Sequence, residues 1–251
     1  MQHIYLIGDS LTQQGYASGW ATMVADKFVR TAEVHNAGLS GYNTTWVLKA
    51  LRGEPLIPGV PAAPYCPKPA EPVLVATVFL GANDAATESC PQSVPVSDFK
   101  ANLTAIVKQV QKDLNPKHGV VVITAPPVDG EAWRRFAELK YGPCPTPNRL
   151  TSRTRDFRNA AIEVSKEVEG CVCFDTFAAL MGAENADTQN CTDDIRHPWM
   201  DLYEDGLHFN AKGGAIIGEG LLKVFHSIGL DGETLPFALP PFLDIVAGAK
   251  A

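Results

Sequence analysis

The stretch DLYEDGLHFNAKGG, residues 201–214, places an acid, Asp205, three residues before a histidine, His208, with a glycine between them. An imidazole oriented by a carboxylate can take the proton of a hydroxyl group, which a serine needs in order to attack a carbonyl carbon. A solvated turn, or a buried histidine satisfied by its neighbour, would use the same residue types. Whether His208 is a catalytic base therefore depends on what the rest of the chain brings to it.

A serine whose hydroxyl could give its proton to His208 lies far upstream: Ser10, in GDSLT, follows an apolar strand-like run. Two more segments carry parts that acyl transfer needs. Gly41, in LSGYNT, lets the backbone approach a reacting carbonyl, and Asn83, in GANDA, offers a side-chain amide. The backbone N–H groups of Ser10 and Gly41 together with the Asn83 amide would form an oxyanion hole. Each motif alone also fits a turn or a helix cap, and the combination is what indicates a serine hydrolase.

Apolar strand-like runs alternate with helical patterns along the chain. Strands that are apolar throughout are buried on both faces, so the alternation predicts an α/β fold, a parallel sheet in a three-layer α/β/α sandwich. Ligands bind beyond the carboxyl ends of such strands, and the segments after the first four strands should meet there. Strands are expected at 3–8, 32–38, 72–81, 119–126 and 171–175, and helices near 16–30, 43–52, 97–114, 148–169 and 212–228. Ser97 is expected to cap the helix near 97–114.

Residues 1–230 are expected to form a single domain. Within them, residues 53–72 hold seven prolines, which block helix interiors and central strands, so this stretch should be a stiff surface loop. It lies between the second and third strands, whose outgoing loops both reach the site, and is therefore expected to reshape access to it. The apolar, proline-broken tail at 231–251 should pack on the domain or trail from it.

Composition excludes several classes of protein. The formal charge is −7 and no basic run occurs, which disfavours nucleic acid as a partner. No apolar run reaches the length of a membrane span, and the chain starts with a strand-like run rather than a signal peptide, so a cytoplasmic location is expected.

No compact His/Asp/Glu cluster is evident, so no metal site is predicted. The spacing of the cysteines favours free thiols and leaves open whether the loop residues pair: Cys66, Cys90, Cys144 and Cys191.

The other titratable residues near these motifs have plainer interpretations. His197 is a rival base, but no aspartate stands at the same short spacing before it. Asp9 and Asp84 are expected to hold loops in place, since an acid beside an oxyanion would oppose it. The remaining histidines are expected at the core edge or the surface: His3, His35, His118 and His226.

Aromatic residues near the motifs could line a substrate pocket, although they fit the core equally well. Such a lining would favour a small acyl ester of an apolar alcohol. The candidates are Tyr42, Trp46, Trp133, Phe136, Trp199 and Phe209.

GDSLT, the glycine of LSGYNT, GAND and DGLH resemble the four signature blocks of the SGNH (GDSL) hydrolase superfamily. TTWVLKAL, PQSVPVSDF and DGLHFNAKG further resemble its isoamyl acetate-hydrolysing esterase branch. The resemblance runs from Ile4 to about Phe225. It implies a flavodoxin-like three-layer fold without metal or organic cofactor. It also implies Ser10 as nucleophile, Gly41 and Asn83 in the oxyanion hole, and Asp205 and His208 as the rest of a triad.

The expected activity is hydrolysis of small-molecule esters with short acyl groups through an acyl-serine intermediate. Two alternatives remain open. The same machinery could act on acetylated sugars, lysophospholipids or thioesters, or the chain could be a non-catalytic relative that binds an acyl ligand.

Overall fold

We describe residues 1–187 and 196–248 of a computed structural model of the protein. Five parallel strands form one sheet in the order β2–β1–β3–β4–β5. The predicted strands are all confirmed to within a few residues. The bounds are β1 (Gln2–Gly8), β2 (Ala32–Gly38), β3 (Val73–Phe79), β4 (Val120–Ile123) and β5 (Cys171–Phe174). The central strand β3 is buried along its whole length, as expected for a sheet covered on both faces.

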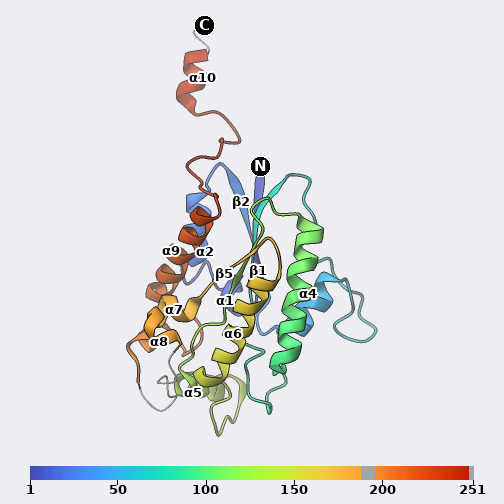
Figure 1. Cartoon of the computed structure of the whole chain (residues 1–251), viewed down its shortest axis with the longest axis vertical. Helices are drawn as coiled ribbons and strands as arrows, with labels where there is room; N and C mark the ends of the chain where they lie inside the picture. Colours follow the sequence, from blue (N-terminus) through green and yellow to red (C-terminus); the bar gives the residue numbers. More distant parts are fainter. Residues whose placement is uncertain (188–195, 249–251) are drawn as a thin grey trace.

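Helices cover both faces of the sheet and complete the three layers (Figure 1). One layer contains α2 (Trp20–Lys27), α7 (Thr176–Met181) and α9 (Ala211–Ser227). The other contains α3 (Thr44–Leu51), α4 (Val96–Leu114) and α6 (Thr151–Glu167). The predicted three-layer α/β/α fold is therefore confirmed. The short elements are α1 (Ser10–Gln13), α8 (Ala183–Ala186) and the 3₁₀ helix η1 (Pro198–Leu202).

One predicted helix cap is wrong, and the structure contains helices that the sequence patterns did not indicate, α7 among them. Ser97 does not cap α4, because the helix begins one residue earlier with Pro95 at the N-cap, and the Ser97 hydroxyl donates to Asp98 instead. Helix α5 (Gly130–Tyr141) was not predicted. Two features indicate this helix: the Asp129 side chain accepts from the Ala132 N–H and caps it, and its apolar residues recur at helical spacing among charged ones.

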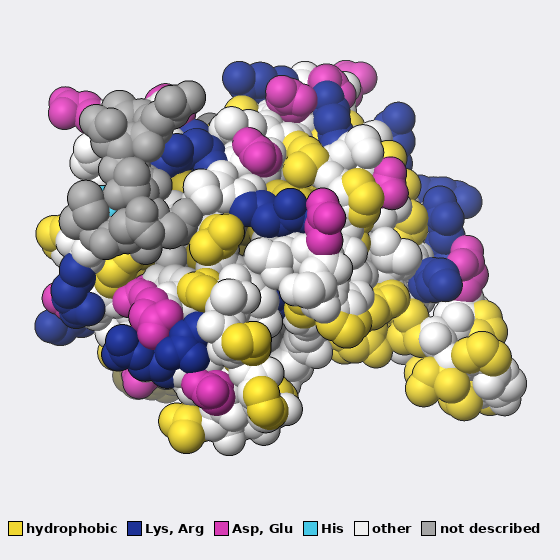
Figure 2. Space-filling view, turned by 90° about the horizontal axis from the view of Figure 1, so that it is seen from below, with side chains coloured by type: hydrophobic (Ala, Val, Ile, Leu, Met, Phe, Trp, Pro, Cys, Tyr) yellow, Lys and Arg dark blue, Asp and Glu magenta, His cyan; other side chains and the backbone are white. Residues whose placement is uncertain are grey.

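The proline-rich stretch contains no helix or strand and lies against the β1–β2 side of the sheet. The Tyr5 hydroxyl donates to the Pro67 carbonyl at 3.0 Å, and the Tyr65 hydroxyl donates to the Ala37 carbonyl at 2.6 Å. Its outer residues, Ile57 among them, are exposed. Figure 2, viewed toward the α5 end of the molecule, shows the stretch as an apolar lobe at the right, beside a face on which acidic and basic side chains are interspersed.

The first part of the C-terminal tail and helix α10 (Phe242–Gly248) differ in their contacts with the rest of the structure. The first part contacts the end of α2, where Lys27 pairs with Asp231 and the Arg30 guanidinium lies over the Phe237 ring at 4.4 Å. Helix α10 has no buried residue and projects away from the rest of the structure (Figure 1). No helix of the described residues is long and apolar enough to cross a membrane.

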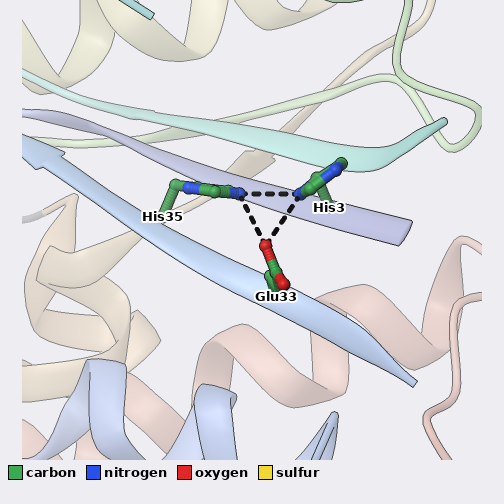
Figure 3. Close-up of side chains that lie close together, drawn as sticks. All are labelled: His3, Glu33 and His35. Atoms are coloured by element: carbon green, nitrogen blue, oxygen red, sulfur yellow. Dashed lines mark hydrogen bonds and ion pairs between the residues drawn. The ribbon is translucent and has the colours of Figure 1, made fainter. Parts of the chain in front are cut away.

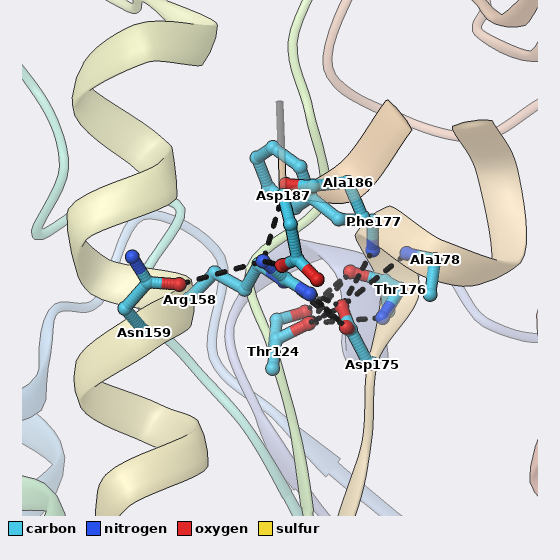
Figure 4. Close-up of polar contacts among 9 residues, drawn as sticks. All are labelled: Thr124, Arg158, Asn159, Asp175, Thr176, Phe177, Ala178, Ala186 and Asp187. Carbon is cyan, nitrogen blue, oxygen red and sulfur yellow. Dashed lines mark hydrogen bonds and ion pairs between the residues drawn. The ribbon is translucent and has the colours of Figure 1, made fainter. Parts of the chain in front are cut away.

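A nearly buried arginine ties α6 to the loop after β5 (Figure 4). Arg158, with a side chain only 6% exposed, donates to Asp175 at 2.5 Å and to Asp187 at 2.7 Å. Asp175 also accepts from the N–H groups of Phe177 and Ala178 and so caps α7. This network holds the carboxyl end of β5 against α6.

The two partners of Arg158 should differ sharply in their effect on stability. Asp175→Ala leaves a buried guanidinium without its main partner and removes the α7 cap, so it should lower the free energy of unfolding by about 3–5 kcal/mol. Asp187→Ala removes a partner that is 79% exposed and should cost less than about 1 kcal/mol. Urea unfolding of both variants measures the difference, and equal losses would show that the network is not built around Asp175.

Candidate active site

Three side chains predicted as a triad form a continuous hydrogen-bonded chain. His208 Nε2 lies 2.8 Å from Ser10 Oγ, and His208 Nδ1 lies 2.7 Å from Asp205 Oδ2. Ser10 begins α1 directly beyond β1, and the other two residues lie on the turn before α9. In this arrangement an acid holds one ring nitrogen while the other faces a hydroxyl, the geometry in which an imidazole can accept the hydroxyl proton.

The turn at 205–208 is built by its own residues and by its contact with α5. Asp205 Oδ1 accepts from the N–H groups of Leu207 and His208, which leaves Oδ2 for the imidazole. Gly206 has a φ of +92°, and a Cβ on it would lie 2.4 Å from the Asp129 carbonyl oxygen. Only glycine permits both this conformation and so close an approach. Burial opposes ionisation of Asp205, but the bonds from His208 and Leu207 outweigh it and keep its pKa below the ordinary value.

The amide of Asn83 is held in one orientation by a polar network beneath the site. Its Oδ1 accepts from Gln92 Nε2 at 3.1 Å and from Arg149 at 3.3 Å. Its Nδ2 donates to the Tyr42 carbonyl at 3.0 Å and faces Asp9 Oδ2 at 3.4 Å. In the flipped orientation the NH₂ group would face the donors of Gln92 and Arg149, so the network directs it toward the Tyr42 carbonyl and Asp9.

Arg149 brings a positive charge into this buried region. The residue is only 2% exposed, and its burial lowers the pKa of the guanidinium. It donates to Gln92 Oε1 at 2.6 Å, and Gln92 in turn donates to the Gly41 carbonyl at 2.7 Å. Arg149 therefore supports both Asn83 and the Gly41 loop. The sequence patterns did not single out Arg149 or Gln92, because both belong to irregular segments without a periodic signal.

Asp9 and Asp84 lie beside these motifs and act on the backbone, as expected. Asp9 accepts from the Leu11 N–H and caps α1, while Asp84 accepts from both the N–H and the hydroxyl of Thr44 at the start of α3. Burial raises the pKa of Asp9 to about 7 and that of Asp84 to about 6. The Asp9 carboxyl therefore keeps part of its protonated form near neutral pH, which limits the negative charge next to Ser10.

A cavity of about 490 Å³ opens over the triad and is more polar than the sequence suggested. Of the proposed aromatic lining residues, Trp133 lines it and contacts the His208 ring edge-on. Phe209 and Trp199 are core residues: Phe209 stacks on Tyr203, and Trp199 meets the same ring edge-on. Tyr42 and Trp46 contact each other and do not line the cavity. Phe136 packs behind Trp133. The lining comes instead from the end of α5 and two loops, and includes Lys140, Tyr141, Cys144, Asn148, Arg149, Cys90 and Gln92.

Three further expectations concern the surroundings of the cavity. None of the described residues that line it belongs to the proline-rich stretch 53–72, so the expected influence of that loop on access is not seen. His197 stacks on Trp199 rather than facing Ser10. Within the described part of the chain Cys66, Cys90, Cys144, Cys171 and Cys173 are free thiols, whereas Cys191 lies outside the described residues.

The sequence profile of the GDSL-like lipase/acylhydrolase family matches residues 6–216, and the chain belongs to this family. A GDSL esterase/lipase of Arabidopsis thaliana is 32% identical over 94% of this chain and 90% of its own. The mouse isoamyl acetate-hydrolyzing esterase 1 homolog is 30% identical over 96% of this chain and 87% of its own. As a member of this family, the protein is a carboxylic ester hydrolase.

Solved structures with the same fold are more distant in sequence. The aryl esterase of M. smegmatis superposes with a TM-score of 0.56 at 19% identity, covering 91% of this chain and 100% of its own. At that level of identity the likeness extends to the three-layer fold.

The raised pKa of Asp9 makes a prediction about stability. The unfolded chain releases this proton near pH 4, whereas the folded protein holds it until about pH 7. The stability that the protonated carboxyl contributes is therefore complete below pH 4 and is lost as the pH rises through 7. Asp9→Asn has no such proton, so its stability relative to wild type should increase steadily between pH 4 and pH 8.

Urea unfolding at a series of pH values measures this change. Asp26→Asn, an exposed aspartate on α2, serves as the matched control. A stability difference between Asp9→Asn and wild type that stays constant with pH would contradict the assignment.

Proposed function

We propose that the protein hydrolyses small or short-chain acyl esters through an acyl-serine intermediate. The observation that carries this proposal is the hydrogen-bonded chain Ser10–His208–Asp205 at the base of a cavity of small-molecule size. The names of relatives such as the mouse protein, which refer to hydrolysis of isoamyl acetate, support a small ester as substrate.

In the proposed reaction Ser10 Oγ attacks the ester carbonyl carbon while its proton passes to His208 Nε2. Asp205 stabilises the imidazolium that forms. The negative charge that develops on the carbonyl oxygen is stabilised by the N–H groups of Ser10 and Gly41 and by Asn83 Nδ2. Collapse of the tetrahedral intermediate expels the alcohol, which takes the proton back from His208. Water then releases the acid from Ser10 by the same steps.

Asn83 is suited to this role because one of its two amide hydrogens is poorly used. The Nδ2 group makes a good bond to the Tyr42 carbonyl but only a long contact, 3.4 Å, to Asp9. An oxyanion would accept the second hydrogen at little cost. Donation from Arg149 and Gln92 to Oδ1 polarises the amide and strengthens Nδ2 as a donor.

The polar lining favours a second candidate for the alcohol part of the substrate. An apolar alcohol was expected from the aromatic residues, but most of those lie in the core. The side chains of Gln14, Lys140 and Asn148 line the cavity and could bind hydroxyl groups. An acetylated alcohol with several hydroxyl groups, such as a sugar acetate, is therefore the second candidate.

Covalent labelling tests whether Ser10 is the nucleophile. Wild type should react with a fluorophosphonate and gain the mass of one adduct, and Ser10→Ala and His208→Ala should lose both labelling and hydrolysis of p-nitrophenyl acetate. Ser40 also lines the cavity, so Ser40→Ala is the matched control and should still be labelled. Labelling that persists in Ser10→Ala would refute the proposed mechanism.

The oxyanion role of Asn83 predicts an effect on kcat. Asn83→Ala should reduce kcat for p-nitrophenyl acetate by roughly 10²–10³-fold with little change in KM, because the lost donor acts mainly in the transition state. Asn159→Ala removes an exposed amide on α6 outside the cavity and should leave kcat unchanged. A normal kcat in Asn83→Ala would remove this residue from the oxyanion hole.

A further inference from the structure

Two histidines and a glutamate converge on one face of the sheet, at the end opposite Ser10 (Figure 3). Strands β1 and β2 are paired so that His3 lies opposite Glu33 and Tyr5 opposite His35. Residues two apart on a strand share a face, so this register places His3, Glu33 and His35 side by side. The sequence did not predict this cluster, because the three residues become neighbours only through the register of the two strands.

The donor atoms of the cluster all lie within 4.8 Å of one another, close enough for a single ion to reach all three. His3 Nδ1 lies 2.7 Å from His35 Nε2 and 3.6 Å from Glu33 Oε2, and His35 Nε2 lies 3.9 Å from Glu33 Oε2. The point equidistant from these three atoms lies about 2.0 Å from each, which is the length of a bond between Zn²⁺ and a histidine nitrogen or carboxylate oxygen.

The surroundings hold the ligands in place and leave one side open. His3 is buried, and the ring of His35 stacks on Tyr5 with centroids 4.7 Å apart. Tyr5 is itself anchored by the Pro67 carbonyl, so the proline-rich stretch supports the cluster from behind. The Glu33 side chain is 55% exposed, which gives an ion a path from solvent and leaves room for water as a further ligand.

The chemistry of the donors selects the kind of ion. Imidazole nitrogens suit first-row transition metals such as Zn²⁺, whereas Mg²⁺ and Ca²⁺ prefer sites made of oxygen atoms. Without a metal, the two facing nitrogens can share only one proton in a hydrogen bond. A divalent cation would use both lone pairs and would also neutralise the Glu33 carboxylate.

We propose that the protein binds one Zn²⁺ ion through His3 Nδ1, Glu33 Oε2 and His35 Nε2. The site lies at the amino ends of β1 and β2, whereas Ser10 follows the carboxyl end of β1. Bound zinc would therefore cross-link the edge strand β2 to β1 and stabilise the sheet without taking part in ester hydrolysis. This inference is independent of the proposed ester substrate.

Isothermal titration calorimetry of the untagged, chelator-treated protein with ZnCl₂ tests the site. Wild type should bind one equivalent and its Tm should rise with added Zn²⁺. His35→Gln and Glu33→Gln replace accessible side chains that the fold tolerates, and each should weaken binding by at least about tenfold. His226→Gln removes an exposed imidazole elsewhere and should bind as wild type does.

Two results would overturn the proposal. One is a wild-type protein that binds no Zn²⁺ at micromolar concentrations. The other is binding that persists unchanged in both His35→Gln and Glu33→Gln, which would place the ion at another site. Circular dichroism of each variant confirms that a loss of binding does not come from unfolding.

Discussion

The hydrogen bond between Ser10 and His208 joins two residues that are 198 positions apart, and the site exists only because the fold fixes both ends of it. Ser10 is set by the end of β1 and the Asp9 cap, and His208 by a turn that Gly206 allows to lie against α5. A reacting pair must be placed to within a fraction of an ångström. The rigid parallel sheet, whose carboxyl ends open on one edge, supplies that precision.

Beneath this pair lies a set of buried charges that costs stability and gives orientation. Asp9, Asp84 and Arg149 are almost fully removed from water, and each makes hydrogen bonds to groups of the site. The unfavourable burial of two carboxyl groups is seen in their raised pKa values. What the protein gains is an Asn83 amide with a single orientation and loops that are already in place before a substrate binds.

The proposed reacting groups and most of the cavity wall are located in different parts of the chain. The proposed reacting groups follow strands of the sheet or precede α9, while most of the cavity wall comes from the end of α5 and from loops around Gln92 and Asn148. Loops can change without loss of the sheet, so this division lets one catalytic framework serve different esters. The wall of this cavity includes polar side chains such as Lys140 and Asn148.

The sequence by itself determined the five strands, the main helices and the grouping of Ser10, Gly41, Asn83, Asp205 and His208, because periodicity and short motifs are local properties of the chain. It could not assign Trp199 and Phe209 to the core, since aromatic residues near a motif fit a core and a pocket equally well. Only the tertiary structure decided that Arg149 supports Asn83 and that His3 meets His35. Those contacts depend on loop packing and strand register, which bring together residues that no local pattern connects.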